Sequence, residues 1–316
     1  MTQEEDHLSQ ATQELRIQGE EMGGGGDAVL IDEGERQEMI EWAEGFVKEA
    51  FRNHDPSHDW HHVHRVRLLA LSLSNSPCLQ GQGIDMLVLE LGALFHDLCD
   101  HKYLAATSTA LETKAQQQDL RLGNGNRVRL AEQVLEPFFL RFPALEPGRR
   151  ETIYRIVENV SWSKDEARRR RRQQEALSRG VDLQQVVLTE TEAWINNCKE
   201  FWCVSDADRL DAIGSIGILR CAAFSAIKNR PLHIPPANPQ GDSIPPAEQA
   251  PGYNESAIAH FHEKLVKIRG DRLFTQSARS EAERRQQLMQ SFLTELDIEW
   301  MVAEQGAQIS QLSSYP

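Results

Sequence analysis

The chain of 316 residues is predicted to be all-α. Apolar residues recur at the i, i+3, i+4 and i+7 positions of amphipathic helices along most of its length. Strand-like runs are scarce, and the β-branched run at 186–188 is too isolated to build a sheet. A hydrophobic content of 40% supports a sizeable core, and the length suits one large domain or two small ones.

The predicted helices follow one another with short breaks. Residues 35–53 carry one apolar face, and residues 61–74 repeat that pattern. Residues 84–96 are apolar on nearly every side, which is typical of a buried helix. Further helices are predicted over 126–142, 151–160, 189–207, 213–227, 254–267 and 281–299.

The sequence predicts one folded domain over residues 34–302, between a disordered acidic tail at 1–33 and a C-terminal tail at 303–316. The first tail has too few apolar residues to offset its chain entropy. Two insertions are expected inside the domain. Residues 163–185 contain the arginine run from Arg168 to Arg172, for which a solvated, mobile helix or loop is favoured over a nuclear-localisation or phosphate-binding role. Residues 231–252 hold seven of the 13 prolines and are expected to form an irregular loop.

Charge and cysteine content narrow the class of protein. A net charge of −14 disfavours a general nucleic-acid or anionic membrane surface, because both partners are polyanions. The five cysteines form no C-x-x-C pair, which indicates neither a disulfide framework nor a structural zinc cluster. No signal peptide and no run of about 18 apolar residues is found. We therefore expect a cytoplasmic protein, with the nucleus as the alternative, and neither a membrane nor a nucleic-acid polymer as partner.

The stretch SHDWHHVHRV at 57–66 is rich in histidine. On a helix, His58, His62 and Arg65 share one face, whereas His61 and His64 point elsewhere. Neighbouring valines draw that face toward the core, where an imidazole needs a partner. Taken alone, His62 is equally compatible with a metal ligand and with a hydrogen-bonded core histidine.

Two further stretches bring carboxylates into apolar surroundings. LGALFHDLCDHKY at 91–103 ends a predicted buried helix with His96 and Asp97, and a buried carboxylate needs a cation or hydrogen-bond donors. VSDADRLDAIGSIGILR at 204–220 contains Asp206, Asp208 and Asp211. These aspartates either pair with arginines of the same stretch or give one member to a metal ion.

Together the stretches offer two imidazoles and two carboxylates, from His62, His96, Asp97 and Asp208. This set suits one divalent ion such as Mn²⁺, Mg²⁺, Co²⁺, Fe²⁺ or Zn²⁺. With water completing its shell, such an ion lowers the pKa of the water and orients a phosphoryl oxygen.

The order H…HD…D resembles the signature of the HD-domain superfamily of metal-dependent phosphohydrolases. SHDWHHVHRV, LFHDLCDHK, DADRLDAIGSIGILR and ESAIAHFHEKLVKIR are similar to consecutive blocks of a branch of small bacterial and fungal HD hydrolases that includes a nucleotide pyrophosphohydrolase. The resemblance covers roughly residues 36–300. It implies an HD-domain helical bundle of irregularly packed helices with long loops.

The resemblance implies that His62, His96, Asp97 and Asp208 hold the ion, with Asp206 as the competitor for the last position. His58 and Asp59 match an H-D-x-x-H extension of the branch, which places them behind the ligands or beside the substrate. Two-metal HD proteins resemble one another in carrying extra histidines between the HD pair and the last aspartate. This chain has none between His101 and His233, so we expect a single ion.

The implied function is hydrolysis of a phosphoanhydride or phosphoester of a nucleotide by metal-activated water. Asp97 or Asp59 is expected to accept the proton of the water. The candidate cations for the phosphate are Arg65, Lys102, Lys264 and Lys267. For each lysine a solvated surface charge is the favoured interpretation, whereas Arg65, one turn beyond His62, is the stronger candidate. The alternatives are a phosphodiesterase or phosphatase for another small phosphorylated metabolite, and a non-catalytic nucleotide-binding HD domain.

Overall fold

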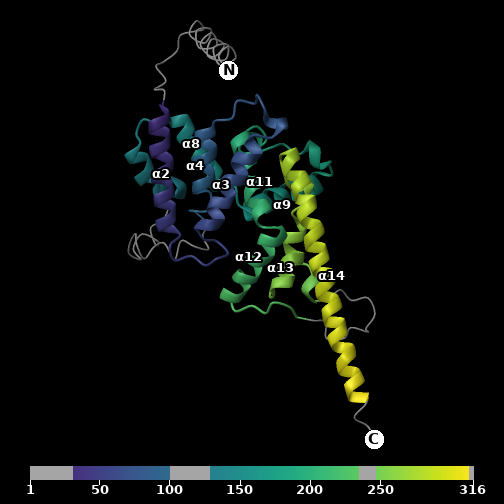
Figure 1. Cartoon of the computed structure of the whole chain (residues 1–316). Helices are drawn as coiled ribbons and strands as arrows, with labels where there is room; N and C mark the ends of the chain where they lie inside the picture. The colour runs from purple at the N-terminus through teal and green to yellow at the C-terminus, as the bar shows by residue number, and fades with distance from the viewer. Residues whose placement is uncertain (1–30, 100–128, 235–246, 313–316) are drawn as a thin grey trace, which may run out of the picture. The chain divides into compact units, whose positions relative to one another are not determined.

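Helix α4 (Met86–Phe95) lies at the centre of the helices that build the core (Figure 1). The computed structural model describes residues 31–99, 129–234 and 247–312. Within these ranges all regular structure is helical, as predicted, and residues from Glu33 onward form one compact unit. The other α-helices are α2 (Glu33–Ala50), α3 (Trp60–Ser74), α7 (Leu130–Arg141), α8 (Pro147–Asn159), α9 (Trp162–Arg179), α10 (Glu190–Ile195), α11 (Lys199–Asp211), α12 (Gly214–Ile227), α13 (Ala257–Glu263) and α14 (Gln276–Leu312). Short 3₁₀ turns occupy Pro77–Leu79, Leu183–Gln185, Ala247–Gln249, Leu265–Lys267 and Gly270–Arg272.

The all-apolar character of α4 follows from its position, because α2, α3, α8 and α11 all pack against it. Every residue from 87 to 95 is buried. Gly92 allows a close approach where α4 meets α8, since a Cβ there would lie 3.0 Å from Cδ1 of Ile156. This buried helix carries His96 at its C-terminal end.

A buried ion-pair cluster joins the first three core helices. Glu90 of α4 is only 5% exposed, yet its carboxylate accepts hydrogen bonds from Arg36 of α2 at 2.6 Å and from Arg67 of α3 at 2.6 and 2.9 Å. Two guanidinium groups therefore compensate one carboxylate that would otherwise be costly to bury. The cluster fixes α3 relative to α4.

Helices α3 and α11 lie side by side in Figure 1 and pack against each other. After α11 the chain turns by 69° into α12. Gly214 begins α12 with a φ of +77°, a conformation that favours glycine, and the side chain of Arg285 from α14 packs 3.1 Å from where a Cβ would lie. The turn places α12 against α13 and α14. Figure 1 shows α12 and α13 below α11, with the long helix α14 running down beside them.

Several helix limits differ from those predicted. The predicted helix 189–207 is two helices, because Thr189 caps α10 and Cys198 caps a new start at α11. The predicted helix 254–267 is α13 followed by a 3₁₀ turn. Helix α14 is longer than 281–299, and residues 303–312, predicted to be part of a tail, continue it. No proline interrupts residues 276–312, so nothing in the sequence stops the helix there.

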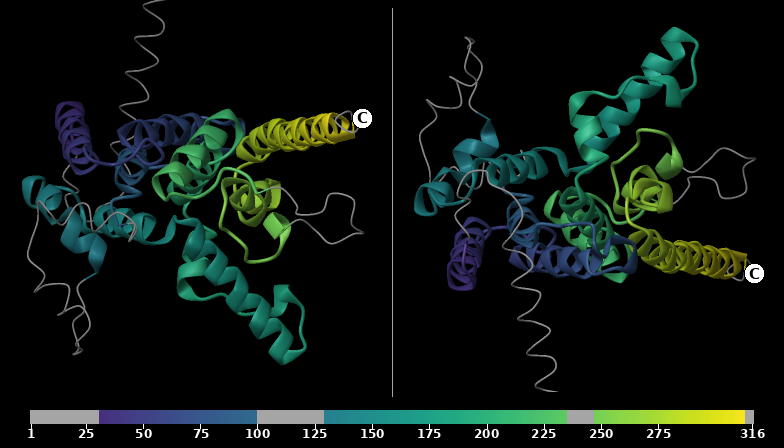
Figure 2. Two further views of the ribbon diagram at one scale, coloured as in Figure 1. Left: turned by 90° about the horizontal axis from the view of Figure 1, so that it is seen from below. Right: turned by 90° about the horizontal axis from the view of Figure 1, so that it is seen from above.

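The predicted insertion 163–185 is mostly helix α9, which projects to one side of the core helices in Figure 2. The prediction for this stretch is a solvated helix or loop, but several of its arginines form hydrogen bonds with other segments. Arg169 donates to the carbonyl oxygen of Asp271 at 3.1 Å, and Arg171 to the carboxylate of Glu192 at 2.6 Å. Only Arg170 of the run keeps a largely exposed side chain, at 69%.

Some predictions fall on residues outside the described ranges. These are the acidic tail up to residue 30, Lys102, residues 126–128, most of the proline-rich insertion at 235–246 and the last four residues. No single described helix is both long and apolar enough to cross a membrane, although the bent pair Lys199–Asp211 and Gly214–Ile227 meets that test by length and composition alone.

Candidate metal centre

The candidate site lies where α3, the end of α4 and α11 meet. Asp59 caps α3, and its Oδ1 accepts from the backbone N–H of His62 at 3.0 Å. This cap fixes the first turn of the helix, so that His62 is directed inward and is fully buried. His96 follows the last turn of α4 and is 2% exposed.

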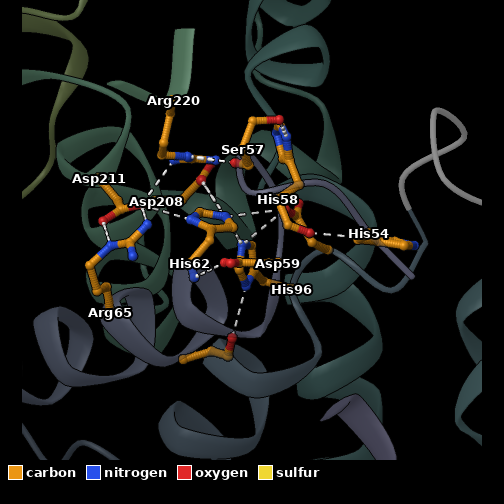
Figure 3. A network of polar contacts seen from close by, with 12 residues as sticks. His54, Ser57, His58, Asp59, His62, Arg65, His96, Asp208, Asp211 and Arg220 are labelled. Carbon is orange, nitrogen blue, oxygen red and sulfur yellow. Dashed lines mark hydrogen bonds and ion pairs between the residues drawn. The ribbon is translucent and has the colours of Figure 1, made fainter. Parts of the chain in front are cut away.

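Four side-chain atoms converge on one point, and Figure 3 shows three of the residues that supply them, His62, His96 and Asp208. Nε2 of His62 lies 3.3 Å from Nε2 of His96, 3.3 Å from Oδ2 of Asp97 and 3.7 Å from Oδ1 of Asp208. Nε2 of His96 lies 3.5 Å from the same oxygen of Asp97 and 3.9 Å from that of Asp208. The structure therefore brings together the four residues that the resemblance implies.

Each histidine presents the same nitrogen to this point because its other nitrogen is engaged. Nδ1 of His96 lies 2.8 Å from the carbonyl oxygen of Ala93, which can only accept, so Nδ1 carries the proton. Nδ1 of His62 lies 2.8 Å from Oδ2 of Asp211. Both Nε2 atoms are thus left as the candidate ligand atoms.

The electrostatics of the cluster favour positive charge at its centre. Burial opposes protonation of His96, but the carboxylates of Asp97 and Asp208 outweigh it and raise the pKa of His96 to about 9. Burial likewise favours neutral Asp97, but the two histidines hold its pKa well below its usual range. A divalent ion at this point would meet two imidazole nitrogens and two carboxylate oxygens, a donor set that fits Mn²⁺, Fe²⁺, Co²⁺ or Zn²⁺ well and Mg²⁺ through its oxygens.

One side of the site is more accessible to solvent than the rest. The side chains of both histidines are 0% exposed, whereas those of Asp97 and Asp208 are 12% and 24% exposed. The carboxylates therefore mark the direction from which water and a substrate reach an ion.

The two candidates for the last ligand point to different places. Asp208 faces the histidines, as described above. Asp206 is fully buried and accepts from the backbone N–H groups of Phe274 and Thr275, at 2.9 and 2.7 Å, just before α14 begins. Asp206 therefore holds α14 against α11, and the geometry favours Asp208 as the ligand.

Arg65, expected at the substrate, is hydrogen-bonded to Asp211. Its Nε and Nη2 donate to the two carboxylate oxygens at 2.7 and 3.1 Å, and its side chain is 32% exposed. Arg220 adds a bond to Asp211 at 2.9 Å. The sequence indicates an arginine as the partner of Asp211 and does not predict its contact with His62. The i, i+3 spacing of Asp208 and Asp211 does indicate that both lie near one face of α11.

The remaining candidates are dispersed. His58 is half-buried, with Nδ1 2.8 Å from the hydroxyl of Ser57 and its ring centre 5.7 Å from that of His62. His61 is exposed, and His64 stacks on Trp60, so neither faces the cluster. Lys264 follows the last residue of α13, and Lys267 pairs with Glu263 at 3.3 Å with about half of its side chain exposed.

Comparison with known proteins gives relatives of similar length. No protein-family model matches the chain. It is 26% identical over 252 residues to the uncharacterized protein YpgQ of Bacillus subtilis, which covers 80% of this chain and 89% of that protein. A crystal structure of YpgQ matches with a TM-score of 0.50 and 23% identity, over 84% of this chain and 97% of that one. Another crystal structure of YpgQ is a complex with ADP.

Two other crystal structures are similar over the same share of the chain. A Lactobacillus plantarum protein matches with a TM-score of 0.52 and 22% identity, over 84% of this chain and 98% of that one. An HD-superfamily hydrolase of Bacillus thuringiensis is 25% identical over 84% of this chain and 98% of that one, with a TM-score of 0.48. The described residues share the fold of these solved structures, and that fold is all-helical, as the sequence predicts.

Proposed function

We propose that the chain is a metal-dependent phosphohydrolase that cleaves a phosphoanhydride or phosphoester bond of a nucleotide. The observation that carries the proposal is the convergence of two imidazole nitrogens, 3.3 Å apart, with one oxygen each of Asp97 and Asp208 lying 3.3 to 3.9 Å from both nitrogens. The four sequence blocks that resemble HD phosphohydrolases support the reaction class. The more exposed side of the cluster supports a catalytic site rather than a closed structural one.

His62, His96, Asp97 and Asp208 would hold one divalent ion. When bound, such an ion supplies Lewis acidity, which lowers the pKa of water and offsets charge that develops on a phosphoryl oxygen. The buried histidines contribute rigid, neutral ligands. The two carboxylates compensate the charge of the ion and lie where a substrate would approach.

The proposal gives Asp97 the task of accepting a proton from the attacking water. Its Oδ2 already lies among the ligand atoms, where it would be close to a water held there, and its depressed pKa keeps it ionised. Asp59 has one carboxylate oxygen committed to the N-terminus of α3. Asp97 is therefore the better placed of the two expected bases.

Arg65 is proposed to contact the phosphate. Its Nε and Nη2 are bound to Asp211, and among the described residues Nη1 has no hydrogen-bond partner. The partly exposed side chain is thus held in place through two of its nitrogens, and the third is available to a ligand. An arginine fixed in this way binds a phosphoryl oxygen without first losing its side-chain freedom.

The test is a substrate panel on the full chain after treatment with a chelator. Nucleoside tri-, di- and monophosphates and simple sugar phosphates would be offered with Mn²⁺, Mg²⁺ or Co²⁺, and the products separated by ion chromatography. Release of pyrophosphate from a triphosphate indicates a pyrophosphohydrolase, and release of orthophosphate indicates a phosphatase. Metal-dependent nucleotide binding without any cleavage would replace the enzyme by a nucleotide-binding domain.

A further inference from the structure

We propose that Asp211 is a positioning residue that holds His62 in the tautomer and orientation of a metal ligand. The proposal rests on the metal centre of the proposed function, but not on the reaction or the substrate. Asp211 is 2% exposed and ends α11, the helix that also carries Asp208. It has no contact with the ligand atoms themselves and acts only through the far side of the His62 ring.

The contact is direct and buried on both sides. Oδ2 of Asp211 lies 2.8 Å from Nδ1 of His62, and the side chain of His62 is 0% exposed. An ionised carboxylate can only accept, so this contact places the imidazole proton on Nδ1. Nε2 is then directed to the point where Nε2 of His96 lies 3.3 Å away.

Two arginines hold the carboxylate in place (Figure 3). Arg65 of α3 donates to both oxygens of Asp211, and Nη1 of Arg220 from α12 donates to Oδ2 at 2.9 Å. Arg220 is itself anchored, because its Nε donates to the carbonyl oxygen of Ser57 at 2.7 Å. The carboxylate is therefore fixed by donors from two helices and cannot turn away from His62 without breaking these bonds.

The pairing also explains why a buried acid is tolerated here. Two guanidinium groups, which stay charged under all ordinary conditions, compensate one carboxylate. Such a partner behind a ligating histidine fixes its ring and raises its basicity, and losing the partner typically weakens metal binding about 10- to 100-fold.

Asp206 gives a matched control on the same helix. It is also buried, at 0% exposure, and also accepts several hydrogen bonds, but its donors are Phe274 and Thr275 rather than His62. Replacing either aspartate by asparagine removes one buried negative charge from α11. Only one of the two replacements touches a metal ligand.

The test compares Asp211→Asn, Asp206→Asn and the unmodified full chain after removal of bound metal. Affinity for Mn²⁺ is measured by isothermal titration calorimetry. We expect Asp211→Asn to bind Mn²⁺ about 10-fold or more weakly and Asp206→Asn to bind it as the unmodified chain does. Equal affinity in Asp211→Asn and the unmodified chain would overturn the proposal.

A second comparison, made in the His62→Gln variant, tests whether Asp211 affects metal binding only through the overall structure. In His62→Gln, Asp211 has no imidazole to position, so adding Asp211→Asn should weaken Mn²⁺ binding no further. If it weakens binding as much in this background as in the unmodified chain, Asp211 acts by another route and the proposal is wrong.

A spectroscopic measurement on the unmodified, metal-free chain needs no folded variant of Asp211. Long-range ¹H–¹⁵N correlation spectra report which ring nitrogen of each histidine carries a proton, and the loss of one set of signals in His62→Gln assigns His62. The proposal requires a proton on Nδ1. A bare Nδ1 contradicts it, whatever the stability of Asp211→Asn.

None of these readouts uses hydrolysis, so a chain that cleaves no phosphate would refute the proposed function and leave this proposal standing.

Discussion

Nε2 of His62 and Nε2 of His96 lie 3.3 Å apart, although the two residues come from different helices and are separated by 34 positions. If each ring carries a single proton on Nδ1, as the proposed metal ligands would, two nitrogen lone pairs face each other. Such lone pairs repel unless a proton or a cation lies between them. Asp97 and Asp208 add two carboxylates at the same point, so the arrangement favours a divalent ion.

A bound ion should stabilise the folded chain. At an Mn²⁺ concentration about 100 times the dissociation constant, the free energy of unfolding should rise by roughly 2.7 kcal/mol, because the ligands are assembled only in the folded state. Thermal unfolding with and without Mn²⁺ measures this change. His62→Gln should abolish it, whereas His61→Gln, which alters an exposed neighbour on the same helix, should not. An equal stabilisation of both variants would place the ion elsewhere.

Asp59 is expected to act mainly as the cap of α3. Asp59→Ala leaves the N–H group of His62 without its side-chain acceptor and should lower the free energy of unfolding by about 1 kcal/mol. Asp59→Ser retains an acceptor and should recover most of this loss in urea unfolding. If the serine variant is as unstable as the alanine variant, the capping role is wrong.

The same serine variant separates the two expected bases. If Asp97 accepts the proton, Asp59→Ser should keep most of the hydrolytic rate, and Asp97→Asn should lose about 100-fold or more. Initial rates at saturating metal and substrate measure the difference. The reverse ranking would assign the base to Asp59.

Glu90 should be essential for the packing of α4. Glu90→Gln leaves two guanidinium groups without their buried carboxylate and should cost about 3 kcal/mol of unfolding free energy. Glu33→Gln is the matched control, because Glu33 pairs with the same Arg36 but its side chain is 83% exposed. That variant should change the free energy by less than about 1 kcal/mol. Similar losses in both variants would show that burial of the pair does not matter.

Asp165 should make the stability depend on pH in the acid range. Burial favours its neutral form, but Arg209, Arg272 and Arg169 outweigh burial and hold the pKa of Asp165 below its usual range. A depressed pKa in the folded state stabilises the fold above the unfolded value of about 3.9 and loses that effect as pH falls through the folded value. Stability should therefore fall below about pH 4.

The measurement is urea unfolding of the unmodified chain and Asp165→Asn at pH 7 and at several values below pH 4. The variant should be less stable at pH 7 and lose less stability on acidification. Glu38→Gln removes an exposed pair with Arg141 and serves as the control that should be nearly neutral at pH 7. An identical acid slope in Asp165→Asn and the unmodified chain would rule out this carboxylate as a source of the pH dependence.

The sequence predicts the helical fold well because the signals are local. The apolar run of α4, the i, i+4 spacing of His58 and His62, and the paired His96 and Asp97 are all readable within one or two helical turns. The start of α14 is not readable in this way, because it depends on Asp206, which is 69 positions from Thr275. The break between α10 and α11 depends on caps at two neighbouring positions inside a continuous helical pattern.

The candidate site likewise combines residues that local sequence signals identify with contacts between residues far apart in the sequence. Its four candidate ligand residues could be selected from their chemistry and from the order of the sequence blocks that resemble HD hydrolases. The partners of these ligands could not, because Asp211 meets His62 from 149 positions away and Arg65 from 146. Those contacts exist only once α3 and α11 have packed. The sequence therefore predicts a role for Arg65 at the substrate alone, whereas two of its nitrogens bind Asp211.

The central claim is that the cluster around Asp208 binds an ion that the reaction requires. The most direct measurement is nucleotide hydrolysis by the chelator-treated full chain, before and after adding Mn²⁺, for the unmodified protein, Asp208→Asn and Asp206→Asn. We predict cleavage only with the ion, a loss of about 100-fold or more in Asp208→Asn, and little change in Asp206→Asn beyond its stability. Hydrolysis that needs no metal, or that is equally fast in Asp208→Asn, would contradict this account.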